Sequence, residues 1–568
     1  MRRHYIIFFL IISLLLTSCQ PSAPSETIDQ SFRKFTDSLF REWVCCDSLT
    51  LNYTLKEPGK FGITKLPRGF SSPSEDNSPS CQAENLLQRL HQYNAKELSL
   101  PHRILYDTLE DYLSCELDSS RYPSFSNWLN PSSGIQAQLP VLLAEFHLQT
   151  AQDVRQYFLL LQSVPGYFQS LLSTENEKKE AATLPARSSI QKIIQQCDHF
   201  ITQNGTNMIQ SCFARQVKAQ FPRKASSLIT KHKSLLQHCV IPAYRDLSTG
   251  LTALLPFAPS DGSLASYADG RSYYRFLFRE KTGSSQSVSD WQKKLTRRLK
   301  KAENQLISYA TTDPAAFRTC EDYQSKFTSP DHILSTLQKS IRRDFPACPS
   351  TSYQLHYVDP SLQDYLSPAF YLTPPIDDRK SNAIYINHSP RYRFSSLFNT
   401  LAHEGYPGHL YQNCYLRSRN LPLLRYILDF PAYTEGYATY AEVYSYRYTG
   451  ASAIETGILQ NNTIATHCIY ALCDIGIHYQ HWTKMQLRSF LETHGITGEE
   501  NIRHVYEAII ESPGSYLPYT IGYLQIEELR PTFHSDMDFH TFLLDMGPTS
   551  FEIIKKYQPL SSEEHSKR

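Results

Sequence analysis

The sequence predicts a mostly α-helical protein with one small β-sheet. Long segments repeat apolar residues at the three- and four-residue spacing of a helix. Glycine, which weakens helices, is scarce at 21 of 568 residues. Short segments rich in aromatic and β-branched residues, which favour strands, gather between residues 350 and 390. These three observations define the fold class that we expect.

The first residues indicate export from the cytoplasm. Arg2 and Arg3 precede an apolar run from Tyr5 to Leu16, which is shorter than the roughly 20 residues of a membrane span. The following Thr17-Ser18-Cys19 completes a segment that resembles a bacterial lipobox. We therefore predict a signal peptide over residues 1–18, a lipidated Cys19 and a tether to about residue 30. An ordinary signal peptide with a cysteine nearby by chance is the alternative.

Charge and cysteine content narrow the class of protein. Removal of residues 1–18 takes away two arginines and no acidic residue, which leaves the mature chain nearly neutral. This balance argues against a nucleic-acid partner, which requires a basic surface, and leaves membrane attachment to the acyl chains. Outside the cytoplasm disulfides are permitted, so we expect a few disulfides together with buried thiols, and Cys320 and Cys348 are a plausible pair. The connectivity stays open.

Helical periodicity is clearest from Ser287 to Tyr309, where Trp291 begins an apolar stripe and Ser287 or Ser289 can cap the start. Further helices are predicted over residues 153–172, 188–204, 225–238 and 331–344. A serine- and proline-rich stretch over 71–80 predicts a loop. We place a soft boundary near residue 350, between a helical N-terminal region (31–350) and a catalytic region (351–568), and expect the two to share one core.

Three short strands are predicted just before the main motif, over residues 353–358, 369–372 and 383–387. Proline-rich turns separate them. An edge of this sheet would be able to pair with the extended backbone of a bound peptide. A purely structural sheet is the other interpretation, and the sequence does not decide between them.

A candidate metal site follows the strands, in Leu401-Ala402-His403-Glu404-Gly405-Tyr406-Pro407-Gly408-His409. Two histidines that bind zinc, with a glutamate next to one of them as the general base, are typical of catalytic zinc sites. A spacing of six leaves the histidines about 120° apart on an ideal helix, so the helix must break or bulge between them. Pro407 and the two glycines permit such a break.

A second block, Tyr433-Thr434-Glu435-Gly436-Tyr437-Ala438-Thr439-Tyr440-Ala441-Glu442, supplies candidate carboxylates. In a helix, Glu435 and Glu442 share one face, so one can bind the metal and the other can orient a ligand histidine from behind. His403, His409 and Glu435 would leave a fourth position open for water, as in catalytic zinc sites. A buried polar cluster without metal, and an ordinary ion pair for Glu442, are the structural alternatives.

These two blocks, together with Pro513-Gly514, the segment Tyr519-Thr520-Ile521-Gly522-Tyr523 and Leu529-Arg530, resemble the bacterial domain-of-unknown-function 885 family. The upstream segment Asp269-Gly270-Arg271-Ser272-Tyr273-Tyr274 adds to the resemblance, which runs over residues 30 to 560. The family often has tryptophan in place of Tyr437 and Gln-Ala-Thr-Ser in place of residues 515–518. The second difference affects the placement of Tyr519.

The family in turn resembles helical zinc peptidases of the thimet-oligopeptidase and angiotensin-converting-enzyme kind. This resemblance implies a large helical zincin-like peptidase fold with a deep channel, Zn²⁺ as cofactor and peptides as substrates. It implies that Glu404 takes a proton from the attacking water, and that Tyr519 stabilises the oxyanion. Tyr523 or Arg530 would hold a substrate carboxylate. For Tyr519 and Arg530, a core tyrosine and a surface arginine are the alternatives.

The predicted function is zinc-dependent hydrolysis of peptide bonds by a membrane-anchored, extracytoplasmic lipoprotein. Two alternatives are a lipoprotein that binds peptide or another solute without catalysis, and a zinc hydrolase that acts on amide bonds of cell-wall peptides. A pure binder has no need of the base Glu404. The sequence does not fix the physiological substrate, the choice between end and internal cleavage, or the oligomeric state.

Overall fold

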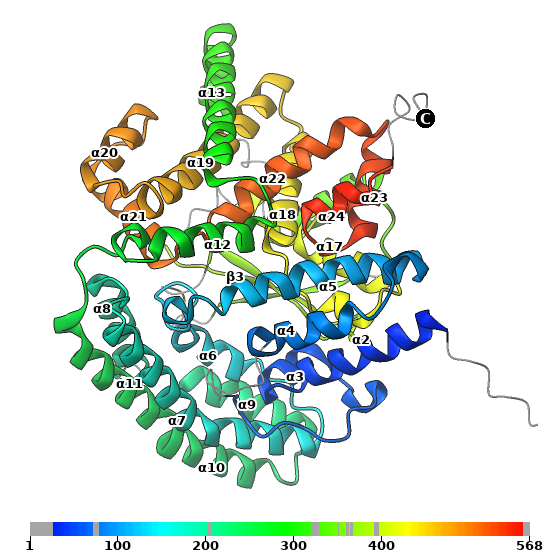
Figure 1. Cartoon of the computed structure of the whole chain (residues 1–568), viewed down its shortest axis with the longest axis vertical. Coiled ribbons are helices and arrows are strands. Elements are labelled where there is room, and N and C mark those ends of the chain that lie inside the picture. Colours follow the sequence, from blue (N-terminus) through cyan, green and yellow to red (C-terminus); the bar gives the residue numbers. More distant parts are fainter. Residues whose placement is uncertain are drawn as a thin grey trace, which may run out of the picture.

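The computed structural model describes residues 27–71, 79–202, 206–320, 327, 329–349, 351–358, 363, 367–390 and 397–559. The predicted signal peptide, Cys19 and most of the predicted loop over 71–80 lie outside these residues. Within them the protein is mostly helical with one three-stranded sheet, which confirms the predicted fold class (Figure 1). No helix among the described residues is both long enough and apolar enough to cross a membrane.

The N-terminal helices begin within the last residues of the predicted tether. Thr27 caps the first of them through a capping box with Gln30. These helices lie near the centre and right of Figure 1, in blue. They are α2 (Ile28–Val44), α3 (Ser48–Thr54), α4 (Pro79–Leu90) and α5 (Leu100–Ser119).

The next helices form a layer of their own along the lower edge of the molecule (Figure 1). Their apolar faces build a separate hydrophobic core from residues 129–258, in which Leu160, Leu161 and Val240 are fully buried. The helices are α6 (Ile135–Ala144), α7 (Ala151–Glu180), α8 (Arg187–Thr202), α9 (Asn207–Gln220), α10 (Ala225–Leu235) and α11 (Ile241–Leu254).

The remaining helices, except the one over Pro314–Cys320, pack with α2–α5 around the main core, so residues on both sides of position 350 share it. The helix predicted from Ser287 is α13, where Ser287 caps the start and Trp291 is fully buried. The helices are α12 (Gly270–Thr282), α13 (Val288–Thr312), α14 (Pro314–Cys320), α15 (Pro330–Ser340), α16 (Leu397–Glu404), α17 (His409–Ser418), α18 (Pro431–Ser445), α19 (Ala453–His478), α20 (Lys484–Thr493), α21 (Glu499–Glu511), α22 (Leu517–Leu529), α23 (Asp536–Met546) and α24 (Phe551–Lys556).

The predicted sheet forms with the strand order β1-β3-β2. The strands are β1 (Tyr353–Tyr357), β2 (Ala369–Leu372) and β3 (Asn382–Ile386), and β3 lies near the centre of Figure 1. The central strand β3 pairs in parallel with β1 and antiparallel with β2. β2 is therefore an edge strand of the sheet.

The predicted disulfide between Cys320 and Cys348 is absent, and both residues are free thiols. Cys320 is buried in a small cluster with Ala316 and Ile458. Cys348 instead packs against the main core, near Cys414. The two thiols occupy different apolar environments, so burial rather than covalent pairing accounts for them.

Candidate metal centre

The helix that carries His403 ends at Glu404, and a new helix begins at His409. Between them the chain folds back on the last turn of α16, where the N–H of Gly408 donates to the carbonyl of Ala402 at 3.0 Å. A Cβ atom at position 408 would lie 1.8 Å from the carbonyl oxygen of His403, so only glycine fits there. The predicted break between the two histidines is confirmed.

The break brings the two histidines to one carboxylate. Nε2 of His403 and Nε2 of His409 each lie 3.4 Å from Oε2 of Glu435. One ligand atom from each of the three residues lies within 4.8 Å of the other two. Two ligand atoms that each bind a zinc ion at about 2.1 Å in tetrahedral geometry lie about 3.4 Å apart. The three side chains therefore fit a zinc ion.

The electrostatics of Glu435 also suit a cation. Its Oε2 atom is buried, and no donor among the described residues has hydrogen-bonding geometry toward it. Burial raises the pKa of Glu435, but the charges of His409 and His403 more than offset this and hold the pKa well below its usual range. Glu435 is therefore an ionised carboxylate with a free oxygen that faces two imidazole nitrogens.

His403 lies between two carboxylates. Its Nδ1 atom lies 3.5 Å from Oε2 of the buried Glu442, whose other oxygen accepts a hydrogen bond from Asn399 at 3.0 Å. Burial lowers the pKa of His403, but Glu435 and Glu442 outweigh it and raise the pKa to about 10 in the absence of metal. Glu442 is thus positioned to orient the histidine through Nδ1, the ring nitrogen that does not face Glu435.

A close crossing of α18 and α22 places Tyr519 beside this cluster. A Cβ atom on Gly522 would lie 2.1 Å from the carbonyl oxygen of Ala432, and one on Gly436 would lie 2.5 Å from Gly522. Because both positions are glycine, the two helices approach each other closely. The ring of Tyr519 then lies along that of His403, with centroids 5.9 Å apart and planes inclined by 19°.

Tyr519 is held in its protonated form. Burial, together with the charges of Glu435 and Glu404, raises the pKa of the phenol well above its ordinary value. The hydroxyl can therefore donate a hydrogen bond at any physiological pH. This is the property that the stabilisation of an oxyanion requires.

Glu404 is half-buried and contacts the edge of the sheet. Its Oε2 atom accepts a hydrogen bond from the backbone N–H of Tyr371 at 2.9 Å. Tyr371 lies on β2, so the edge strand runs directly past the predicted general base. Sequence reasoning missed this contact because a backbone group leaves no signature in the residue types.

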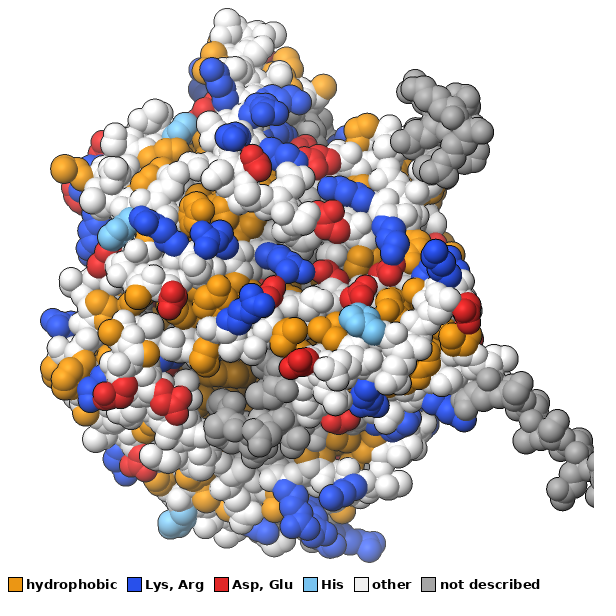
Figure 2. Space-filling view, in the orientation of Figure 1, with side chains coloured by type: hydrophobic (Ala, Val, Ile, Leu, Met, Phe, Trp, Pro, Cys, Tyr) orange, Lys and Arg blue, Asp and Glu red, His pale blue; other side chains and the backbone are white. Residues whose placement is uncertain are grey.

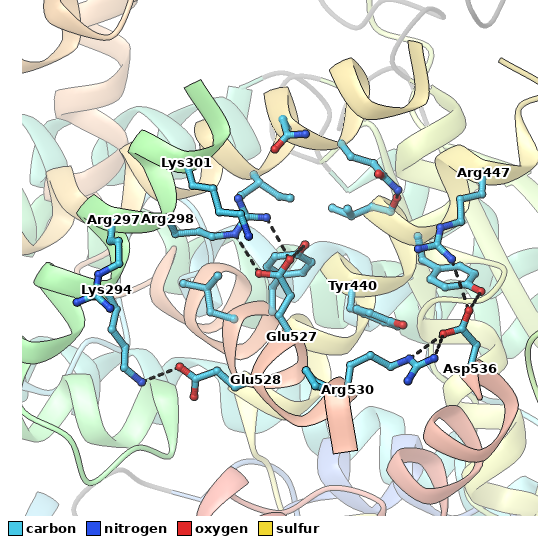
Figure 3. A pocket seen from close by; sticks show the side chains of 18 of the residues that line it. Lys294, Arg297, Arg298, Lys301, Tyr440, Arg447, Glu527, Glu528, Arg530 and Asp536 are labelled. Atoms are coloured by element: carbon cyan, nitrogen blue, oxygen red, sulfur yellow. Dashed lines mark hydrogen bonds and ion pairs between the residues drawn. The ribbon is translucent and has the colours of Figure 1, made fainter. Parts of the chain in front are cut away.

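The structure does not bring Tyr523 and Arg530 to the histidines. The hydroxyl of Tyr523 donates to Glu527 at 2.6 Å, and Arg530 pairs with Asp536 at 2.6 Å. Both residues line a cavity to which none of the metal-site residues contributes (Figure 3). Their predicted role as holders of a substrate carboxylate stays a prediction.

His467 on α19 is a further residue near the site that sequence reasoning missed. Its ring lies nearly parallel to that of Tyr519, with centroids 6.4 Å apart and planes inclined by 10°. Burial lowers the pKa of His467, and the opposing charge of Glu442 does not offset this. A neutral imidazole thus lies beside the ring of Tyr519. The only sequence signal is a histidine within the long apolar helix α19.

The fold and the site define a mostly helical protein with a candidate metal centre of two histidines and one glutamate. The chain belongs to the bacterial family of unknown function DUF885, whose model matches residues 64–557. This agrees with the resemblance that the sequence motifs show.

Two solved structures share the fold. One is a presumed lipoprotein from Colwellia psychrerythraea, with a TM-score of 0.78 at 17% identity, over 93% of this chain and 98% of that one. The other is a presumed lipoprotein of unknown function from Shewanella oneidensis, with a TM-score of 0.64 at 14% identity, over 94% of this chain and 99% of that one. No protein of curated function matches the chain.

Proposed function

We propose that this protein is a zinc-dependent peptidase. The observation that carries the proposal is the convergence of His403, His409 and Glu435, with Glu404 adjacent to the first of them. Two imidazole nitrogens and one carboxylate, with a further position free for water, form the donor set of catalytic rather than structural zinc sites. When bound, zinc would polarise the scissile carbonyl and acidify the attacking water.

The protein's own residues account for the proton transfers. Glu404 is placed to accept the proton of the attacking water and to pass it to the leaving amine. The N–H of Tyr371 fixes one of its oxygens, which leaves the other for the water. Tyr519, which stays protonated, donates to the oxygen that becomes negative during attack.

The edge strand supports a peptide as the substrate. Hydrogen bonds hold the sheet together at its ends, from the N–H of Val358 to the carbonyl of Ile386 and from the N–H of Asn387 to the carbonyl of Pro368. The N–H of Tyr371 instead points away from the sheet, toward Glu404. Along an antiparallel edge, alternate residues present their N–H and C=O groups outward. An extended peptide that pairs with β2 would therefore pass the general base and the candidate zinc ligands.

The lipid anchor is part of the proposal. The segment Leu16-Thr17-Ser18-Cys19 lies outside the described residues, and the two structural neighbours are presumed lipoproteins. We expect the full chain to fractionate with membranes in a bacterial host. A Cys19→Ser variant should lose this fraction, and its retention there would contradict lipidation at this residue.

The test of the peptidase is cleavage of a mixed peptide library by residues 20–568, with products identified by mass spectrometry. We expect the Glu404→Gln variant to keep its zinc and lose activity by about a hundredfold or more. Glu84→Gln, an exposed glutamate on α4, is the matched control and should remain active. The cut positions will distinguish trimming from internal cleavage.

Three outcomes would overturn the proposal as stated. Turnover that persists in Glu404→Gln would exclude this residue as the base. Cleavage restricted to cell-wall peptides would indicate a narrower amide hydrolase. Binding of peptides without turnover by zinc-loaded protein would indicate a solute-binding lipoprotein.

A further inference from the structure

A cavity of about 920 Å³ lies between helices α13, α18, α19 and α22 (Figure 3). This volume is within the range of pockets that take small molecules. Its walls are partly aromatic, with Tyr440 and Tyr523 among the lining residues. None of the residues assigned to the metal centre lines it, so it is a separate feature of the molecule.

The walls of the cavity carry an excess of positive charge. Figure 3 shows the cationic side chains of α13 on one side, with Arg447, just after α18, and Arg530, just after α22, across from them. Six basic residues line it, against three acidic ones. The basic residues are Lys294, Arg297, Arg298, Lys301, Arg447 and Arg530, and the acidic ones are Glu527, Glu528 and Asp536.

The three acidic residues are all engaged with cations of the same cavity. Glu527 accepts two hydrogen bonds from Arg298, at 3.0 and 3.1 Å. Glu528 pairs with Lys294 at 2.7 Å, and Asp536 pairs with Arg530 at 2.6 Å. Asp536 also lies 3.5 Å from Arg447, so the three carboxylates are shared among four of the six cations.

Two cations on α13, Arg297 and Lys301, have no anionic partner among the described residues. Arg297 and Lys301 are exposed, and no hydrogen bond or ion pair connects either to another described residue. The third nitrogen of Arg298, Nη1, is buried without an acceptor among the described residues. A buried guanidinium N–H without an acceptor is costly, so a ligand that supplies one is favoured. Lys and Arg side chains gather over α13 in the space-filling view (Figure 2).

We infer that this cavity is a binding site for a small oligoanion that carries two or more phosphate or carboxylate groups. The two unpaired cations lie on α13, and on the facing wall Arg447 and Arg530 share the single carboxylate Asp536. This excess of positive charge on two walls fits a ligand with several anionic groups better than a single ion. Guanidinium groups bind both carboxylates and phosphates through paired hydrogen bonds. The aromatic walls can cover the apolar part of an organic anion.

The site lies close to the metal centre. Tyr523 lines the cavity one helical turn after Tyr519, a rise of about 6 Å along α22. On α19, Ile464 lines the cavity one turn before His467. The inference rests on charge and shape alone and does not depend on the proposed peptidase activity.

The test is a calorimetric titration of the chain over residues 20–568 with two probes, inorganic diphosphate and tricarballylate. The decisive variant is Arg297→Ala/Lys301→Ala, which removes the two exposed cations without disturbing any described contact. Lys293→Ala/Lys300→Ala is the matched control, because it removes the same charge from exposed positions on α13 that do not line the cavity.

We expect at least one probe to bind, and its affinity to fall about tenfold in the first variant while the control stays within about twofold of the wild type. Binding of diphosphate alone would assign the site to phosphates, and binding of tricarballylate alone to carboxylates. An equal loss of affinity in both variants would mean that only the net charge of the protein matters, which would contradict a binding site in this cavity. Failure of both probes to bind would also contradict it. Coordination of a probe to zinc would contribute equally to its affinity for the wild type and for both variants, so it does not alter the comparison.

Discussion

The Nδ1 atom of His403 lies 3.5 Å from Oε2 of Glu442, on the side of the ring opposite the nitrogen that faces the candidate metal position. A carboxylate in this position fixes the orientation of a ligand histidine and increases its basicity as a ligand. The buried location of Glu442 and its hydrogen bond from Asn399 hold the carboxylate in turn.

We therefore expect Glu442→Gln to weaken zinc binding by about 10- to 100-fold without abolishing it. The affinity can be measured by competition with a chelating dye. Glu303→Gln is the matched control, because Glu303 lies 2.5 Å from a different histidine, His494, and neither residue belongs to the candidate metal cluster. Unchanged zinc affinity in Glu442→Gln would show that this carboxylate is an ordinary ion-pair partner.

The close packing at Gly408 gives a second prediction. In Gly408→Ala the new Cβ would overlap the carbonyl oxygen of His403, so the turn between α16 and α17 must rearrange and separate the two histidines. We expect the melting temperature to fall, with a destabilisation of about 3 kcal/mol or more, and zinc binding to be lost. Calorimetry and zinc analysis of the purified variant measure both effects.

Gly166→Ala provides the contrast for this substitution. Gly166 lies inside α7, and a Cβ atom there meets nothing within 4 Å. Because alanine is the better helix former, the variant should be more stable by about 1 kcal/mol. Similar stability losses at both positions would mean that the contact with His403 is not the cause.

The candidate metal ligands were predictable because zinc sites use few residue types at limited spacings. His403, His409 and Glu435 stand in two short blocks, and the six-residue spacing itself required the break that the structure shows. The three strands and the stripe on α13 were predictable for a similar reason, since local periodicity determines them.

The tertiary details of the site were not predictable from one sequence. The hydrogen bond from Tyr371 to Glu404 involves a backbone group, and the position of His467 depends on how α19 packs beside α22. The two glycines at positions 436 and 522 are far apart in the chain, and their function becomes visible only where the helices cross. The predicted Cys320–Cys348 pair failed because a count of cysteines says nothing about their distance in the fold.

Tyr519 gives a prediction that depends on the proposed function. In Tyr519→Phe the ring and its packing against His403 remain, but the donor to the developing oxyanion is lost. We expect kcat on a cleaved library peptide to fall about 100- to 1,000-fold, with little change in KM and with zinc retained. A rise in KM at constant kcat would instead place the hydroxyl in ground-state substrate binding.

Asp474 allows a test that is independent of metal and substrate. This carboxyl is fully buried on α19, where it accepts hydrogen bonds from the hydroxyl of Tyr274 at 2.5 Å and from the N–H of Gly514 at 2.8 Å. Burial outweighs these two bonds and raises the pKa of Asp474 to about 7. Between about pH 4 and pH 7 the folded protein therefore holds a proton here that the unfolded chain has released.

Because the folded state binds more protons in this range, the contribution of Asp474 to stability is fully present near pH 4 and is lost as the pH rises to about 7. In Asp474→Asn the amide can reproduce the bonds of the protonated acid, and it does not titrate. The melting temperature of the variant relative to the wild type should therefore rise from pH 5 to pH 7 and level off above it. Scanning calorimetry at pH 5, 6, 7 and 8 measures this difference, in which the titration of all other groups cancels. A difference that is constant across the series would mean that Asp474 is ionised throughout, so that the bonds from Tyr274 and Gly514, rather than burial, control its charge.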